Sequence, residues 1–221
     1  MRKKASYPAL PPQAPRANFK LLRKLGQLLM RLHGWRIVGE FPAEPKMILV
    51  GLPHTSNWDG YYAILFLLSL NLRISMMIKH TALQGPLGGV MRRLGFVGIN
   101  RKAAKDVAGQ MVEQFRQHER FWLAITPEGT RTQAAEIKTG FHRIARAANV
   151  PLLPVAIDFK NKCVRILPPL TASADVKADL QALLALYPGV AWPRHPERMS
   201  APMRQVMQPE GTLIEPPRER F

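Results

Sequence analysis

Short apolar runs alternate with longer amphipathic segments along most of the chain. Runs of about four to eight mostly apolar residues have the length of buried strands, whereas apolar residues three or four positions apart form one face of a helix. The predicted strands are 47–52, 73–78, 96–99, 121–126, 152–159 and 163–169. The predicted helices are 59–70, 86–94, 102–118, 139–148 and 174–186. This alternation predicts an α/β fold, a layered αβα domain with a largely parallel central sheet.

Residues 19–36 follow a different pattern, that of one amphipathic helix. At about 100° per residue, its leucines and its tryptophan fall on one arc of about 140°. They are Leu21, Leu22, Leu25, Leu28, Leu29, Leu32 and Trp35. The opposite side carries only basic charges, Lys20, Arg23, Lys24 and Arg31. Two interpretations are open: a basic helix that lies in a membrane interface, and a surface helix whose apolar side packs on the domain.

The two ends of the chain are rich in proline and show no periodicity. The sequence thus divides into an extended basic proline-rich tail (1–18), the amphipathic membrane-interface helix (19–36), the main α/β domain (37–187) and a proline-rich C-terminal extension (188–221). Neither end is expected to contribute much to the hydrophobic core.

No segment is expected to cross a membrane. The longest apolar run, 61–72, reaches Arg73 well short of the roughly 20 residues that a spanning helix needs. The basic N-terminus is not followed by the apolar stretch of a secretory signal. We therefore expect a protein that is not secreted and that attaches peripherally to the cytoplasmic face of a membrane.

The chain carries 32 basic and 15 acidic residues, a net charge of +17. This surplus favours an anionic partner: nucleic acid, an anionic membrane surface or a phosphorylated substrate. Nucleic-acid binding is the remote alternative, and no nucleic-acid partner is expected, because the sequence lacks a dense basic run and basic–aromatic interleaving. The single cysteine, Cys163, rules out an intrachain disulfide, and no histidine pair has zinc-site spacing, so no metal is expected.

Candidate chemistry begins directly after the first predicted strand, with His54 and Asp59. Histidine is a natural general base for a hydroxyl group, and a carboxylate can fix its tautomer and stabilise the imidazolium. Residues five positions apart do not meet on one helix. We therefore expect His54 to end a loop and Asp59 to begin the next helix, with Ser56 or Asn57 as its N-cap.

Three further stretches join this pair. In "TPEGTR", residues 126–131, Gly129 permits close backbone approach, Arg131 suits an anionic ligand, and Glu128 can accept hydrogen bonds from an arginine or a substrate hydroxyl. Arg101 ends the short strand-like run "GFVGINR". Residues 150–155, "VPLLPV", are apolar and contain no titratable group, as expected for the lining of a pocket.

In this order the four stretches resemble the glycerolipid acyltransferase family, whose best-known members acylate lysophosphatidic acid. That family has four ordered blocks: H-x4-D, G-x-[IF]-x-[IV]-x-R, E-G-x-R and V-P-[IVL]-[IV]-P-V. The corresponding residues here are His54 to Asp59, Gly95 to Arg101, Glu128 to Arg131, and Val150 to Val155.

The resemblance implies a glycerol-3-phosphate acyltransferase-like fold and acyl transfer from acyl-CoA or acyl-carrier protein to a lysophospholipid hydroxyl, most simply 1-acyl-glycerol-3-phosphate giving phosphatidic acid. His54 would be the general base and Asp59 its support, without an acyl-enzyme, metal or other cofactor. The acceptor phosphate would be bound by Arg101, Glu128, Gly129, Thr130 and Arg131. The pocket would be lined by Val150, Pro151 and Pro154. The membrane would be contacted by Leu21, Leu25, Leu28, Leu32, Trp35, Lys20, Arg23 and Lys24.

The chain departs from the family pattern at three positions. Pro53 stands where many members have asparagine, Asn100 where aspartate is common, and Thr126 where phenylalanine is frequent. These changes keep the histidine–aspartate pair but leave the acceptor open. An ornithine-type lysolipid or another lysophospholipid is the alternative acceptor, and a catalytically silent lipid-binding relative is disfavoured because both His54 and Asp59 are present.

Overall fold

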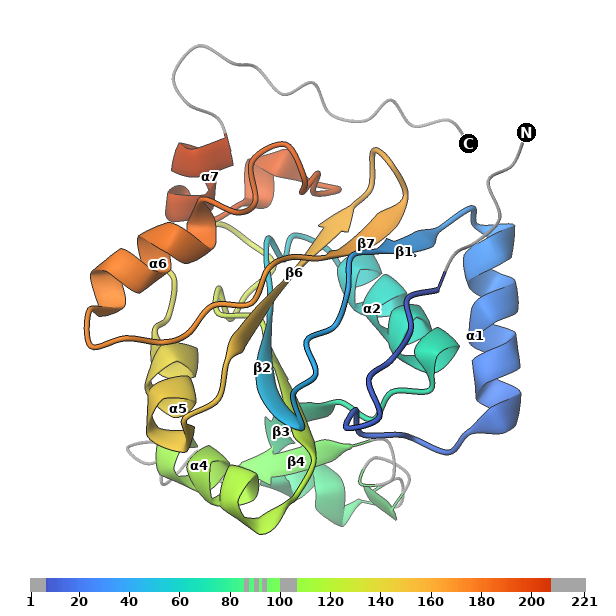
Figure 1. The fold of residues 1–221 in the computed structure, drawn as a ribbon. Coiled ribbons are helices and arrows are strands. Elements are labelled where there is room, and N and C mark those ends of the chain that lie inside the picture. The colour runs from blue at the N-terminus through green and yellow to red at the C-terminus, as the bar shows by residue number, and fades with distance from the viewer. Residues whose placement is uncertain (1–6, 86–87, 90–91, 93–94, 100–106, 208–221) are drawn as a thin grey trace.

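The structure is a computed structural model that describes residues 7–85, 88–89, 92, 95–99 and 107–207. Its centre is a seven-stranded sheet in the order β1-β7-β6-β2-β5-β3-β4 (Figure 1). The strands are β1 (Arg36–Val38), β2 (Lys46–Gly51), β3 (Ser75–Lys79), β4 (Phe96–Ile99), β5 (Phe121–Ile125), β6 (Leu152–Asp158) and β7 (Cys163–Ile166). Neighbouring strands are parallel except β6 and β7, which form an antiparallel pair.

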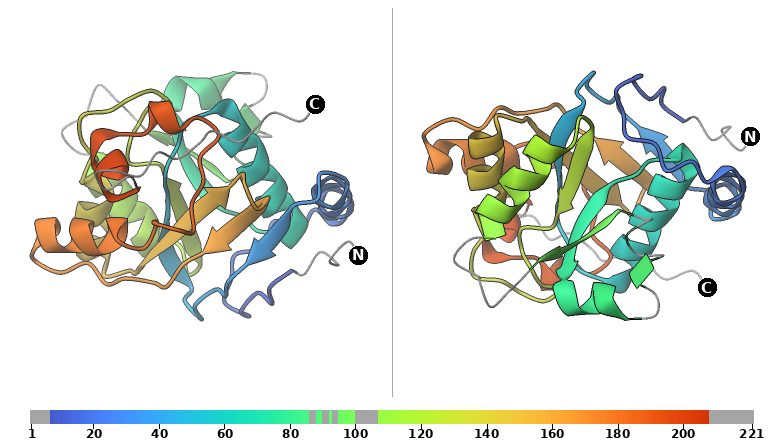
Figure 2. Two further views of the ribbon diagram at one scale, coloured as in Figure 1. Left: turned by 90° about the horizontal axis from the view of Figure 1, so that it is seen from above. Right: turned by 90° about the horizontal axis from the view of Figure 1, so that it is seen from below.

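Helices cover both faces of this sheet (Figure 2). One face carries α1 (Lys20–Leu32) and α2 (Asn57–Leu70). The other carries α4 (Val107–Gln117), α5 (Gly140–Ala148), α6 (Val176–Leu184) and α7 (Ala201–Met207). Side chains of β2 alternate between two cores, with Met47 and Leu49 on the α2 side and Ile48 and Val50 on the α4–α5 side. The predicted αβα fold with a largely parallel sheet is therefore confirmed.

Most predicted elements are present with slightly different ends. The short edge strand β1 and helix α7 were not predicted from the hydrophobic pattern, because each is too short to show a period. The predicted helix 86–94 and the start of the predicted helix 102–118 lie largely outside the described residues. Within the described part of the chain, no helix has the length and apolar character to cross a membrane.

The C-terminal extension does contribute to the core, so that expectation was wrong for residues 188–207. Ala191, Met199 and Met203 are fully buried among the side chains of α4, α5 and α6. The N-terminal tail also buries Ala14 completely in the core on the α2 side. Isolated apolar residues between prolines form no period, so their burial depends on tertiary contacts that the pattern does not reveal.

Helix α1 docks on α2 at a very close approach. A Cβ atom at Gly26 would lie 2.9 Å from both the Cβ of Leu68 and the backbone nitrogen of Ser69. Beside it, the Gln27 side-chain amide donates to the carbonyl of Ser69 at 3.1 Å. At the other end of the contact, the His33 ring lies 5.8 Å from the ring of Tyr61. The two helices therefore run antiparallel, and the end of α1 lies beside the start of α2.

The predicted helix 19–36 ends at Leu32, and Trp35 lies beyond it. The Trp35 side chain is only 3% exposed and stacks on Tyr62 with ring centroids 3.7 Å apart. The prediction that Trp35 contacts a membrane is therefore wrong. The helical wheel placed Trp35 with the leucines because it assumed that the helix continued to residue 36.

The close contact at Gly26 can be tested by its effect on stability. Replacing Gly26→Leu should lower the free energy of unfolding by about 2 kcal/mol, because the new side chain has no space between α1 and α2. Urea unfolding monitored by circular dichroism measures the change. The control, Leu28→Ala in the same helix, alters a half-exposed side chain and should stay within about 0.5 kcal/mol of the wild type. Equal stability of Gly26→Leu and the wild type would contradict the close packing.

Candidate active site

The loop between β2 and α2 delivers His54 and Asp59 to the C-terminal edge of the sheet. It contains a cis peptide bond between Leu52 and Pro53, and Ser56 is the N-cap of α2. The Ser56 and Asp59 side chains form a capping box with each other's backbone amides. The predicted arrangement, a loop ending at His54 and a helix beginning around Asp59, is confirmed.

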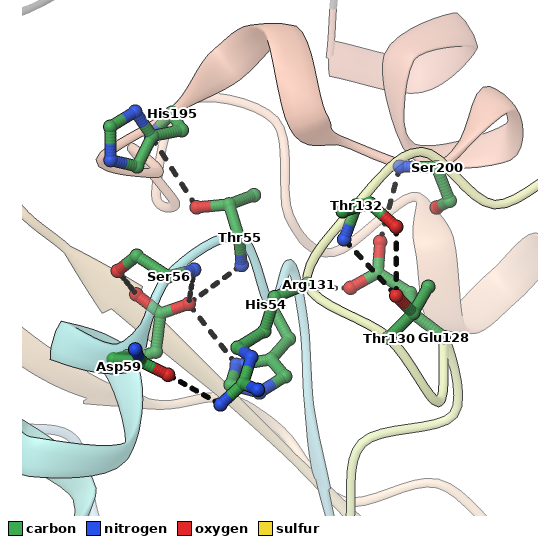
Figure 3. Close-up of polar contacts among 11 residues, drawn as sticks. His54, Thr55, Ser56, Asp59, Glu128, Thr130, Arg131, Thr132, His195 and Ser200 are labelled. Carbon is green, nitrogen blue, oxygen red and sulfur yellow. Dashed lines mark hydrogen bonds and ion pairs between the residues drawn. The ribbon is translucent and has the colours of Figure 1, made fainter.

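The carboxylate of Asp59 collects four hydrogen bonds from this loop (Figure 3). Its Oδ2 atom accepts from the backbone amides of Thr55 at 2.6 Å and Ser56 at 2.8 Å, and lies 3.1 Å from Nδ1 of His54. Its Oδ1 atom accepts from the Ser56 hydroxyl at 3.0 Å. Asp59 is 4% exposed, whereas the side chain of His54 is 20% exposed. The carboxylate is thus held inside the protein and the imidazole faces outward.

This contact decides which nitrogen of His54 can act as a base. An ionised carboxylate only accepts hydrogen bonds, so Nδ1 of His54 carries the hydrogen and donates it to Asp59. The lone pair of the neutral ring then lies on Nε2. When Nε2 takes up a proton, the nearby carboxylate stabilises the resulting imidazolium.

Glu128 holds the same loop from the other side. Its Oε2 atom accepts from the backbone amide of His54 at 2.5 Å, and its Oε1 atom accepts from the backbone amide of Ser200 at 3.3 Å. The residue is 3% exposed. The prediction placed Glu128 against an arginine or a substrate hydroxyl; the structure instead engages both of its oxygens with backbone amides. Glu128 is therefore a positioning residue for His54.

The C-terminal segment reaches the site, a contact that the sequence pattern does not predict. The backbone amide of His195 donates to the hydroxyl of Thr55 at 3.4 Å, and Ser200 contacts Glu128 as described above (Figure 3). These pairs are separated by 140 and 72 residues in the chain. No local pattern signals contacts of this range. Residues 195–200 therefore belong to the frame of the site.

Tyr187, which precedes this segment in the chain, also forms a long-range hydrogen bond. It is fully buried, and its hydroxyl donates to the carbonyl of Val50 at 3.0 Å. Burial, with the charge of Glu128 nearby, raises the pKa of Tyr187 well above its usual range. The hydroxyl therefore stays protonated and ties the end of α6 to β2, the strand that leads to His54.

The remaining predicted phosphate-binding residues lie in the loop after β5. Arg131 is exposed, and its guanidinium donates to the side-chain oxygen of Asn57 in the first turn of α2. Gly129 has a φ of 65°, a conformation that favours glycine, and a Cβ there would lie 2.9 Å from Nζ of Lys138. The hydroxyl of Thr130 pairs with that of Thr132 at 2.9 Å, and Arg101 lies outside the described residues. Two cations, Arg131 and Lys138, thus flank this loop.

A cavity of about 460 Å³ opens beside His54. It lies between α2 and the strands of the sheet, and among the described residues the polar side chains that line it are His54, Asp59 and Thr126. Its apolar walls come from α2, β3, β4 and β6, including Phe66, Met76, Met77, Phe96 and Ile157. The volume and the apolar lining are in the range of sites for small molecules.

The predicted pocket lining from residues 150–155 is confirmed at Val155 and wrong at the three residues singled out, Val150, Pro151 and Pro154. The cavity is lined on β6 by Val155 and Ile157, and not by Val150, Pro151 or Pro154. Val150 is buried in the core on the opposite side of the sheet, and Pro151 precedes β6 at the edge away from His54. Side chains alternate between the faces of a strand, so an apolar run alone does not show which of its residues face a cavity.

Comparison with known proteins identifies the family of the chain. Residues 36–158 match the family model described as Acyltransferase, which spans more than half of the chain. The chain belongs to the acyltransferase family. The resemblance seen in the four sequence stretches is therefore confirmed at the level of the family.

The acyltransferase fold is also found in a solved structure. The crystal structure of the 1-acyl-sn-glycerophosphate (LPA) acyltransferase PlsC from Thermotoga maritima is similar, with a TM-score of 0.52 and 19% sequence identity. The match covers 74% of this chain and 73% of that chain. At this identity the likeness shows a shared fold. No curated protein matches the chain.

No group of three or more histidine, cysteine, aspartate or glutamate side chains in the described part of this acyltransferase could hold a metal ion. The chemistry suggested by the described side chains is that of an imidazole base, a supporting carboxylate and nearby cations. These side chains, at the mouth of an apolar cavity, suit acid–base chemistry at His54.

The contacts of Glu128 in this acyltransferase can be tested by substitution. Glu128→Gln should lower the free energy of unfolding by about 1–3 kcal/mol, because a side-chain NH₂ would face a buried backbone amide that needs an acceptor. The control is Glu197→Gln, at an exposed glutamate within residues 195–200. Its free energy of unfolding should stay within about 0.5 kcal/mol of the wild type. Urea unfolding measures both. If both substitutions had equal effects, Glu128 would not be holding the loop.

Proposed function

We propose that the protein transfers a fatty acyl group from acyl-CoA or acyl-carrier protein to a hydroxyl of a lysophospholipid, with 1-acyl-glycerol-3-phosphate as the leading acceptor and phosphatidic acid as the product. The single observation that carries this proposal is the position of the His54–Asp59 pair at the polar end of an apolar cavity. A base beside an apolar cavity suits a reaction between a hydroxyl group and a fatty acyl thioester.

In the proposed reaction, Nε2 of His54 removes the proton from the acceptor hydroxyl. The oxygen attacks the thioester carbonyl, the new ester bond forms, and the bond from carbon to sulfur breaks. The leaving thiolate takes its proton from the imidazolium, which returns His54 to the neutral state. Asp59 stabilises the imidazolium during these steps, because its buried carboxylate stays 3.1 Å from Nδ1. A thioester is an activated donor, so the reaction consumes no other co-reactant.

The acceptor phosphate would bind at the loop after β5. Arg131 and Lys138 bring two positive charges to this loop, and Arg131 is held beside the first turn of α2 by Asn57. A planar guanidinium suits bidentate contact with a phosphate. Gly129 and Thr130 shape the loop, and Arg101 would add a third cation. This arrangement supports an acceptor that carries phosphate close to the reacting hydroxyl.

The acyl donor and acceptor would be bound at a membrane surface through α1. Leu21, Leu25, Leu28 and Leu32 form one row along this helix and are 79%, 46%, 51% and 68% exposed. The side of α1 that contacts α2 is a different one, formed by Gly26 and Met30. Lys20, Arg23, Lys24 and Arg31 are exposed as well. A leucine row with neighbouring basic residues suits the interface of an anionic membrane.

The geometry of the helix pair relates this row to the cavity. Because α1 and α2 are antiparallel and meet at Gly26, Ile64 on α2 projects to the same side of the pair as the leucine row. Ile64 is 50% exposed and lines the rim of the cavity. A membrane contacted by the leucine row would therefore lie next to the opening of the cavity.

The activity is tested with labelled palmitoyl-CoA and a panel of lysolipids that includes lysophosphatidate and an ornithine-type lysolipid. We expect product on lysophosphatidate and a fall in kcat of about 100-fold or more in His54→Ala, because general-base catalysis is lost. His118→Ala, a histidine just before β5 whose ring contacts the carbonyl of Gln114, is the matched control, because it lies at the edge of the sheet away from His54. Product on another acceptor alone would replace the named substrate, and full activity of His54→Ala would contradict the general-base role.

Membrane binding is tested with vesicles that contain anionic phospholipids. The double substitution Leu25→Gln and Leu28→Gln should reduce co-sedimentation at least about fivefold, because two exposed leucines no longer insert into the interface. Salt should weaken binding of the wild type, because screening reduces the attraction of the basic residues. Val176→Gln, at an exposed valine on α6, is the control. Equal sedimentation of all three proteins would exclude α1 as the membrane contact.

A further inference from the structure

Gly60 occupies the interior of α2, one residue after Asp59. Glycine in a helix interior is unfavourable, since the unfolded chain gains more conformational freedom from glycine than from alanine. Glycine at this position therefore lowers the stability of α2, and the lack of a side chain needs another explanation. The atoms around position 60 show whether the packing of the fold provides one.

Two other helical glycines provide the comparison. At Gly26 a Cβ would overlap α2, so the packing of the fold requires glycine there. At Gly140, the first residue of α5, a Cβ would meet nothing within 4 Å. Gly60 resembles Gly140 in this respect, because its Cβ would also meet nothing within 4 Å. The described structure therefore gives no reason within the fold for glycine at position 60.

The position of Gly60 differs from that of Gly140 in one respect, its place on the cavity wall. Gly60 lines the cavity beside His54 and Asp59, whereas Gly140 is exposed on α5. Gly60 and Ile64 are four residues apart and so follow each other along the same side of α2 at the cavity rim. The empty space at Gly60 is thus the part of this rim that lies nearest to the catalytic pair.

We propose that Gly60 is retained for the substrate: the space left by its missing side chain is the passage through which a fatty acyl chain enters the cavity beside His54. The inference rests on the proposed function for the nature of the ligand. Both the acyl donor and the lysolipid acceptor carry a fatty acyl chain, and either one suits the apolar walls. A side chain at position 60 would narrow the passage without disturbing the helix.

The proposal predicts that substitutions at Gly60 stabilise the fold but weaken the binding of substrate. Gly60→Ala should raise Tm by about 2 °C, because alanine favours the helix and its methyl group meets no other atom. The same substitution should raise KM about tenfold for the ligand whose chain uses the passage, since one methyl group in an apolar site can have an effect of this size. Gly60→Leu should raise this KM further. Gly140→Ala and Gly140→Leu are the matched controls and should leave both KM values unchanged.

Binding measurements separate this proposal from the proposed function. In the His54→Ala background, which carries out no general-base step, calorimetry compares palmitoyl-CoA with CoA and lysophosphatidate with glycerol 3-phosphate. Weaker binding of one chain-bearing ligand in the Gly60 variants, with the Gly140 variants unaffected, supports the passage and identifies the ligand that uses it. This result stands even if the wild type transfers no acyl group to any acceptor.

Two results would overturn the proposal. A Tm of Gly60→Ala below that of the wild type would show that the fold itself requires glycine at this position. Unchanged binding of both palmitoyl-CoA and lysophosphatidate in Gly60→Ala and Gly60→Leu would show that no acyl chain passes there.

Discussion

The carboxylate of Asp59 belongs to two structures at once, the N-terminal cap of α2 and the proposed catalytic pair with His54. Its hydrogen bonds to the amides of Thr55 and Ser56 hold the loop after β2 in place, and the same Oδ2 atom orients His54. A helix end leaves backbone amides without partners, so a buried carboxylate at this point satisfies them. The imidazole is therefore positioned by the same bonds that allow the helix to begin.

Glu128 completes the support of this loop from the β5 side. A buried carboxylate is costly unless hydrogen-bond donors surround it, and here the donors are the amides of His54 and Ser200. The C-terminal segment and the loop that carries His54 are thus bound to the same carboxylate.

Gly26, Gly60 and Gly140 show how the same residue type serves different needs in the helices of one fold. Gly26 allows α1 and α2 to approach closely on one side of α1, while the leucine row on another side is half or more exposed at most of its positions. Gly140 has no contact to make, and Gly60 opens toward the cavity. The surface proposed for membrane contact and the passage proposed for substrate therefore both involve faces of the α1–α2 pair.

Several features followed from local sequence alone. Strand and helix alternation predicted the layered sheet, and the spacing from His54 to Asp59 predicted a loop followed by a capped helix, because these features depend on neighbouring residues. The leucine side of α1 was also predicted from the helical period, but only the structure shows that part of it is exposed, and its contact with a membrane stays a prediction. Glycine at position 60 was visible in the sequence, but its meaning was not, since a helical glycine can serve packing, a ligand or neither.

Other features were decided only by the tertiary structure. Trp35 is buried because the chain leaves the helix at Leu32 and turns back onto α2, and Val150, which lies between α5 and β6, is buried in the core on the other side of the sheet. The contacts of Glu128 and Thr55 join residues 72 to 140 positions apart. Local sequence determines which elements form and which residues cap them. The packing of those elements determines which side chains meet, because such contacts depend on the relative placement of segments that are distant in the chain.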